Sequence, residues 1–144
     1  MRSSWLLVLG ATVLLVGQAV AGGHEGFAIV YAVVGLAIAY WLSPWQGGRS
    51  LTHAEVVSSP GVERRVVIYW RPGCVFCARL RARLGSLRRR ATWVNIWQDP
   101  AAAAFVASVN DGNEVVPTVV IDGVPFTNPE PDRVREVLAA RQAD

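Results

Sequence analysis

Two cysteines, Cys74 and Cys77, stand two residues apart and are the only cysteines in this chain of 144 residues. A short β-branched and aromatic run at residues 66–70 precedes them, followed by Arg71 and a Pro-Gly turn signal. Leucines then recur at helical spacing, so Cys74 is expected at the amino end of a helix. Backbone donors and partial positive charge stabilise a thiolate there, and Arg71 adds charge. Cys77, one turn later, is near enough in principle to close a disulfide.

Other uses of this cysteine pair fit the sequence less well. A zinc site needs four ligands, but the only histidines, His24 and His53, lie in a short connector and in a linker. A structural disulfide would close a very small loop and would constrain the unfolded chain little. Two inert buried cysteines are the third alternative. The strand–turn–helix context and a later Val116-Pro117 favour thiol–disulfide redox chemistry.

The carboxy-terminal part of the chain is expected to position these cysteines in a small α/β sheet. After the first strand, periodicity and turn signals predict a helix at 75–90, a strand at 92–97, a helix at 99–110, strands at 115–122 and 124–127, and a helix from 130 to 142. Asp99 is the expected cap of the second helix. Asp122-Gly123 predicts a tight hairpin. Parallel strands joined by crossovers and finished by a hairpin are typical of such a sheet.

The residues around the cysteine pair resemble those of the thioredoxin-fold glutaredoxins. The shared features are the run Tyr-Trp-Arg-Pro-Gly-Cys-Val-Phe-Cys at 69–77 and the Val-Pro-Thr at 116–118, whose Val-Pro peptide the family holds cis. Residues 99–106, 109–110, 112–113 and 127–129 extend the resemblance to the actinobacterial mycoredoxins. The resemblance covers about residues 64–142 and implies an α/β thioredoxin-like (glutaredoxin) domain.

The resemblance implies a thiol–disulfide oxidoreductase in which Cys74 attacks and Cys77 can resolve through an internal disulfide. Its implied partners are S-thiolated or disulfide-containing proteins and a low-molecular-weight thiol, with no bound cofactor and no metal. The expected substrate-binding residues are Arg71, Phe76, Val116, Pro117, Thr127 and Asn128. A mechanism that uses one cysteine and a mechanism that uses both stay open.

One departure from the glutathione-using relatives concerns the identity of that small thiol. Those relatives typically carry Gly-Gly and an acidic residue after the last strand, whereas residues 126–131 here read Phe-Thr-Asn-Pro-Glu-Pro. Mycoredoxins use mycothiol, a cysteine-bearing pseudo-disaccharide, and the polar groups of Thr127 and Asn128 suit such a neutral ligand. Mycothiol is the expected co-substrate. Arg71 stands where glutaredoxins often place a basic residue, which keeps glutathione as the alternative.

The amino-terminal part holds two apolar runs, residues 5–21 and 27–42, that contain no charged side chain. Each reaches about 20 residues with its flanks, which at ~1.5 Å per residue crosses a ~30 Å hydrocarbon layer. With a mean hydropathy of +0.30, the chain is expected to form a two-span transmembrane hairpin at 1–45, a linker at 46–61 and the redox domain at 62–144. A buried soluble hairpin is the alternative, although little other apolar surface is available to cover it.

The charges that flank these runs predict the side of the membrane. The basic residues nearest to the runs are Arg2, before the first run, and Arg49, Arg64 and Arg65, after the second. The positive-inside rule then places both chain ends, and hence the redox domain, in the cytoplasm at the cell membrane. Cleavage of a signal peptide after Ala21 is an alternative that would leave one span. Two rivals stay open, namely an extracytoplasmic disulfide enzyme held by one span and a non-catalytic membrane adaptor that binds a partner or an iron–sulfur cluster.

Finer patterns predict local contacts within the hairpin and the linker. The second run carries a small-residue stripe that we expect to pack against Gly10 and Gly17 of the first run. The stripe consists of Ala28, Ala32, Gly35 and Ala39. Thr52 and Glu55 have the spacing of a capping box, which predicts a short helix within the linker.

The arginine content bears on the binding partners. A formal net charge of +3 is too small for a nucleic-acid binder. The arginines that cluster on the predicted helix at 75–90 are Arg79, Arg81, Arg83, Arg88, Arg89 and Arg90. They most simply form a solvated face, and the alternative is attraction of a tethered domain to anionic lipid.

Overall fold

The structure is a computed structural model that describes residues 4–59, 61 and 66–140. It divides into two compact units, residues 1–48 and 49–144, and each unit is described by itself. Three of the flanking arginines, Arg2, Arg64 and Arg65, lie outside the described residues, as does the expected end of the last helix at residue 142.

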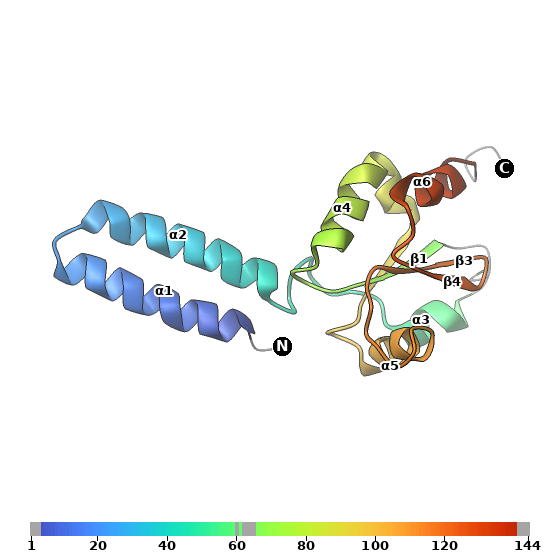
Figure 1. Cartoon of the computed structure of the whole chain (residues 1–144), viewed down its shortest axis with the longest axis horizontal. Helices are drawn as coiled ribbons and strands as arrows, with labels where there is room; N and C mark the ends of the chain where they lie inside the picture. Colours follow the sequence, from blue (N-terminus) through green and yellow to red (C-terminus); the bar gives the residue numbers. More distant parts are fainter. Residues whose placement is uncertain (1–3, 60, 62–65, 141–144) are drawn as a thin grey trace. The chain divides into compact units, whose positions relative to one another are not determined.

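The first unit is a pair of antiparallel helices, α1 (Ser4–Ala21) and α2 (Glu25–Leu42), which lie side by side in Figure 1. Both helices are long and apolar enough to cross a membrane by length and composition. Only 11% of each 18-residue window is buried within the structure. The buried side chains are Thr12 and Ala19 of α1 and Ala28 and Ala39 of α2.

The two helices come into close contact at Gly35, but not against the residues expected. A Cβ atom added at Gly35 would lie 2.1 Å from the Thr12 hydroxyl, whereas a Cβ atom added at Gly10 or Gly17 would meet nothing within 4 Å. The expected packing against Gly10 and Gly17 is therefore wrong. Thr12 fits at the interface because its hydroxyl donates a hydrogen bond to the Val8 carbonyl at 2.7 Å.

The second unit is built on a four-stranded mixed sheet in the order β2-β1-β3-β4. The strands are β1 (Val66–Trp70), β2 (Thr92–Asn95), β3 (Thr118–Ile121) and β4 (Val124–Thr127). β1 pairs parallel with β2 and antiparallel with β3, and β3 pairs antiparallel with β4. The hairpin between β3 and β4 turns at Asp122 and Gly123, both with positive φ, as their sequence predicts.

Two of these strands are shorter than predicted. β2 ends at Asn95 because the Asn95 side chain accepts a hydrogen bond from the Trp97 N–H at 3.0 Å and turns the chain. β3 starts only at Thr118 because Pro117 has no N–H to donate to a neighbouring strand.

Helices cover both faces of the sheet (Figure 1). One face carries α4 (Val75–Leu84), the 3₁₀ helix η2 (Gly85–Arg90) and α6 (Pro131–Ala140). The other carries α3 (His53–Ser58) and α5 (Pro100–Ser108). The predicted helix at 75–90 changes character at Gly85, whose φ of 55° is left-handed and ends the α-helix.

Alternate residues of β1 face the two helical layers and form two cores. Ile68, with no exposed surface, packs in a cluster with Leu80 of α4 and Leu138 of α6. Tyr69 packs on the opposite face in a cluster with Val56 of α3 and Val106 of α5. A central strand buried on both faces explains the continuous apolar run at 66–70.

The segment before β1, expected as a linker, contains a helix that belongs to the second unit. Thr52 and Glu55 form the predicted capping box at the start of α3. Hydrogen bonds across the chain attach this segment to the domain: Ser50 N–H to Gln98 Oε1 at 3.1 Å, Asn95 N–H to Ser50 Oγ at 3.1 Å, and His53 N–H to Asp99 Oδ2 at 2.6 Å. Residues 43–49 are therefore what separates α2 from the first attached residue.

Aromatic side chains reinforce this attachment. The His53 ring stacks on Phe105 with centroids 4.8 Å apart, and its Nδ1 lies 2.7 Å from the Tyr69 hydroxyl. Burial, together with the charge of Asp99, raises the pKa of Tyr69 to about 12, so this hydroxyl keeps its proton at neutral pH.

Asp99 ties two helices to the domain, and its loss is expected to destabilise it. One carboxylate oxygen caps α5 through the Ala101 N–H at 2.9 Å, and the other binds His53 N–H. We expect Asp99→Ala to lower the free energy of unfolding by about 2 kcal/mol, measured by chemical denaturation of the full chain. Asp99→Asn, which keeps an acceptor oxygen, should lose less. A loss with Asp99→Ala no larger than that with Glu114→Ala, at an exposed carboxylate, would contradict this role.

Candidate active site

Cys74 lies at the amino end of α4, as its sequence context predicts. Gly73 has a φ of 69°, a left-handed conformation that lets the chain turn from β1 into the helix. Cys74 is the N-cap residue, and its Sγ accepts the Cys77 N–H at 3.1 Å. The sulfur therefore takes the place of a capping oxygen and is held where the helix dipole favours negative charge.

The two thiols of this site have opposite acidities. A hydrogen bond from the Cys77 thiol is the largest influence that lowers the pKa of Cys74 to about 6, assisted by the backbone N–H groups of Cys77 and Phe76 and the charge of Arg71. Burial opposes this shift. The hydrogen bond to Cys74 and burial raise the pKa of Cys77. At neutral pH the half-buried Cys74 is thus mainly a thiolate, and the buried Cys77 holds a proton.

A loop from the neighbouring strand borders the Cys74 sulfur. The Val116–Pro117 peptide is cis, and the Val116 carbonyl oxygen lies 3.5 Å from Cys74 Sγ, from which it accepts a hydrogen bond when the thiol is protonated. The Asn128 N–H donates to the Pro117 carbonyl at 2.7 Å, which joins this loop to the chain that follows β4. The structure therefore brings three of the expected substrate-binding positions to one side of the cysteines.

Asn110 holds this side of the site together and was not singled out by the sequence as a site residue. Its buried Nδ2 donates to the Val106 carbonyl at 2.7 Å and to Thr118 Oγ1 at 3.1 Å. Its Oδ1 accepts a hydrogen bond from the Thr127 hydroxyl. Thr127 is exposed, but its proton is used in this bond, so its oxygen lone pairs remain for a ligand.

A small pocket opens between α4 and the segment after β4. Its lining residues are Phe76, Arg79, Leu80, Asn128, Pro129, Glu130 and Pro131. Phe76 is 57% exposed, although it is a large apolar side chain next to Cys77. Of the lining residues, only Phe76 and Asn128 were expected in the site. Arg79 and Glu130 add charged groups, and no local signal marks them because the fold alone brings α4 beside residues 128–131.

Several other residues around the cysteine pair are partly or fully buried. Arg71 is half-buried and acts on Cys74 through its charge, while Val116 and Pro117 are buried. Trp70 belongs to the core, and its ring lies 4.6 Å from the Arg81 guanidinium carbon, which lies equally close to Trp93. Within the described residues, no group of three His, Cys, Asp or Glu side chains is placed to hold a metal ion.

The sequence of this domain is similar to the sequences of known proteins. The profile of the family described as Glutaredoxin matches residues 66–126. A protein of Mycobacterium tuberculosis that carries a glutaredoxin name is 43% identical over 74 residues, which are 51% of this chain and 88% of that protein. Mycoredoxin 1 of Corynebacterium glutamicum is 40% identical over 79 residues, which are 54% of this chain and 94% of that protein. No solved structure gives a significant match.

Proposed function

We propose, from the premise that this chain belongs to the glutaredoxin family of thiol–disulfide oxidoreductases, that it reduces mycothiol mixed disulfides on proteins at the cytoplasmic face of a membrane. The observation that carries the chemistry is the Cys74 sulfur at the start of α4, with a pKa of about 6. The cis Val116–Pro117 peptide borders this sulfur, and Phe76, two residues after Cys74, lines a small polar pocket. In this proposal Cys74 is the nucleophile.

The proposed cycle consists of two thiol–disulfide exchanges. The Cys74 thiolate attacks the mycothiol sulfur of the mixed disulfide and forms a new S–S bond with it. The sulfur of the substrate protein leaves as a thiolate and takes a proton from water. The thiolate of a second mycothiol then attacks the sulfur of the bound mycothiol. This releases mycothiol disulfide and restores the Cys74 thiolate. Alternatively, Cys77 loses its proton and attacks Cys74, which releases mycothiol and forms an internal disulfide.

The chemistry of the pocket favours mycothiol over glutathione. Asn128, Arg79 and Glu130 offer amide, guanidinium and carboxylate groups, which can donate hydrogen bonds to sugar hydroxyls and accept them. The similarity to a protein named Mycoredoxin 1 supports the same assignment.

The choice of thiol can be tested by reducing one protein mixed disulfide with mycothiol or glutathione at equal concentration. We expect turnover with mycothiol to be at least about tenfold faster than with glutathione, because a factor of this size corresponds to the free energy of one or two hydrogen bonds. Asn128→Gly, which tolerates the φ of 43° at this position, should raise KM for mycothiol, whereas Ser108→Ala on α5 should not. Equal or faster turnover with glutathione would contradict the assignment.

The exposure of the hairpin supports the membrane placement. A core helix of a soluble protein is mostly buried, whereas α1 and α2 leave most of their apolar side chains uncovered, Leu7 at 77% and Ile29 at 66% among them. Such surface is stable in lipid and unfavourable in water. Trp5 and Trp41 lie at the ends of α1 and α2 away from the connector, where tryptophan suits a membrane interface.

Labelling of intact cells with a membrane-impermeant maleimide tests the orientation. We expect Cys74 to react only after the cells are made permeable, because the redox domain faces the cytoplasm. His24→Cys, in a chain without Cys74 and Cys77, places a thiol in the exposed connector and should react in intact cells. Prompt labelling of Cys74 would overturn the cytoplasmic placement, and a mature chain that starts after Ala21 would overturn the hairpin.

A further inference from the structure

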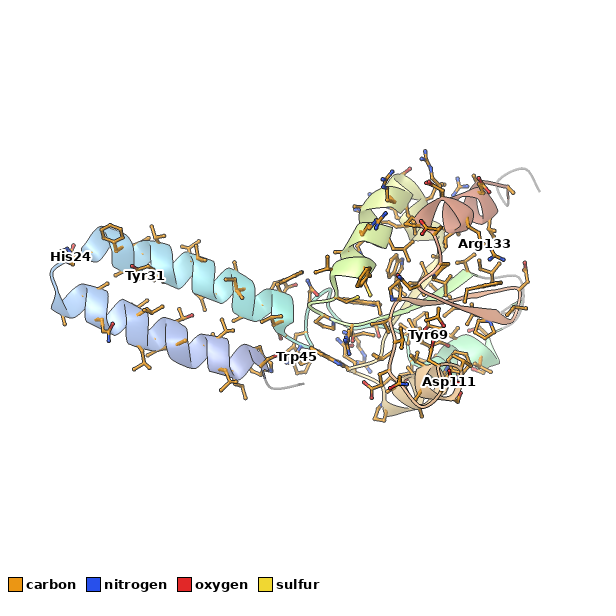
Figure 2. All side chains as sticks on the ribbon, viewed as in Figure 1. His24, Tyr31, Trp45, Tyr69, Asp111 and Arg133 are labelled. Atoms are coloured by element: carbon orange, nitrogen blue, oxygen red, sulfur yellow. The ribbon has the colours of Figure 1, made fainter. Side chains whose placement is uncertain are left out.

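Charge is divided between the two faces of the redox domain. The helices of one face, α4, η2 and α6, carry eight arginines and only two carboxylates, Asp132 and Glu136. Residues 91–129, which include β2, α5, β3 and β4, carry four carboxylates and no arginine or lysine, while Glu130 lies in the pocket beside α4. Figure 2 labels Arg133, which belongs to α6, on one side of the sheet and Asp111, which follows α5, on the other. One helical layer is therefore strongly basic, although the net charge of the chain is small.

Four of these eight arginines are exposed and are not used in the pocket or in the packing of the domain. Arg79 lines the pocket beside the active site, Arg81 and Arg133 lie over aromatic rings, and Arg90 donates to the Leu138 carbonyl. The remaining four, which we call the arginine face, are Arg83, Arg88, Arg89 and Arg135. Within the described part of the chain, none of their guanidinium groups forms an ion pair. Exposed cations of one sign gathered on one layer form an attractive surface for anions.

The length of the tether limits what this surface can reach. α2 ends at Leu42, and Ser50 is already hydrogen-bonded within the redox domain. Seven residues, 43–49, lie between them and span at most about 25 Å when fully extended. If the hairpin lies in a bilayer, as the proposed function has it, the domain stays near the lipid headgroups at a high effective concentration.

We propose that the arginine face docks on anionic phospholipid headgroups of the membrane that holds the hairpin. This inference rests on the membrane placement within the proposed function. The active site stays accessible in the docked state, because Arg83, Arg88 and Arg89 lie at or beyond the carboxyl end of α4 whereas Cys74 lies at its amino end. The ten residues of α4 separate the two ends by about 15 Å. An acidic protein partner is the competing occupant of the same face.

Two exposed serines offer labelling positions in the full chain, which report which face of the redox domain lies closer to the lipid headgroups. Ser86 lies in η2 beside the arginine face, and Ser108 lies at the end of α5 in the opposite layer. In a chain with Cys74→Ser and Cys77→Ser, either Ser86→Cys or Ser108→Cys is labelled with a fluorescent donor. Each protein is placed in bilayers of phosphatidylcholine alone or with added phosphatidylglycerol, and energy transfer to a headgroup-labelled lipid is recorded.

We expect stronger transfer from position 86 than from position 108 only when phosphatidylglycerol is present. The difference should vanish at ~1 M salt, where the Debye length is about 3 Å. Replacing the four residues of the arginine face by Gln should remove it too, since each well-placed arginine contributes a factor of about five to the docking equilibrium. The control replacement Glu114→Gln, at an exposed carboxylate between α5 and β3, should leave this difference unchanged.

The outcomes separate this inference from the proposed membrane placement. A chain that does not enter bilayers at all would overturn both. A chain that enters them but gives equal transfer from the two positions, or a difference independent of lipid charge, would overturn the docking alone. Docking that appears only after an acidic protein is added would assign the arginine face to that partner instead.

Discussion

Cys74→Ser is expected to abolish turnover of a protein mixed disulfide, with a fall in rate of at least about a thousandfold. The reason is that a serine hydroxyl in this position stays protonated at neutral pH and cannot form a disulfide, whereas the Cys74 sulfur has a pKa of about 6. The measurement is steady-state reduction of a mycothiol mixed disulfide by the full chain. Retention of more than a few per cent of the rate would remove Cys74 as the nucleophile.

The matched control is Cys77→Ser, which changes the second thiol one helical turn away. In the cycle through a second mycothiol, only Cys74 forms and breaks disulfides, so this variant should stay within about tenfold of the unchanged protein. Serine can still donate a hydrogen bond to the Cys74 sulfur from the same position. If Cys77→Ser also abolishes turnover, the reaction depends on the internal disulfide.

The rate of Cys74 alkylation is expected to rise about tenfold from pH 5 to pH 7 and then to level off. A group with a pKa of about 6 is mostly protonated at pH 5 and mostly ionised at pH 7. An unperturbed thiol would instead continue to gain reactivity up to about pH 8.5. Initial rates of iodoacetamide labelling between these values give the profile directly, and a midpoint at or above pH 8 would contradict the proposed thiolate.

Cys77→Ala tests the cause of this shift. The hydrogen bond from the Cys77 side chain is the largest influence that lowers the pKa of Cys74, while the Cys77 N–H remains in the variant. The midpoint of the alkylation profile should therefore rise but not reach that of a free thiol.

The lowered pKa of Cys74 also makes the stability of the reduced protein depend on pH. Because the pKa of Cys74 is lower in the folded protein than in the unfolded chain, the thiolate adds to the free energy of unfolding. This contribution is complete above about pH 8.5 and is lost as the pH falls through about 6.

Local signals in the sequence predict local structure well in this chain. Asp99 followed by proline predicts the cap of α5, Thr52 and Glu55 predict the capping box of α3, and Asp122-Gly123 predicts the β3–β4 hairpin. Each signal works because the side chain bonds to, or the residue adopts, a backbone conformation a few residues away. The placement of Cys74 at a helix start is predictable for the same reason.

Contacts between distant parts of the chain are not predictable in this way. The bond from His53 N–H to Asp99 spans 46 residues, and nothing near either residue indicates the other. The same holds for Asn110, which bonds to β3 and β4 but reads as an ordinary residue after a helix. The predicted packing of α1 against α2 was wrong for another reason. Many small residues in α1 and α2 permit several rotations, so the pattern did not select Thr12 over Gly10 and Gly17.

The attachment of α3 decides where the redox domain can be cut free. Val56 is only 1% exposed and covers the side of the sheet formed by Val67 and Tyr69. A soluble fragment that began at residue 66, where the match to the glutaredoxin family starts, would expose this apolar surface to water and would tend to aggregate. A fragment that starts at Arg49 would keep the domain whole, so a soluble version of this domain should begin well upstream of the residues that match the glutaredoxin family.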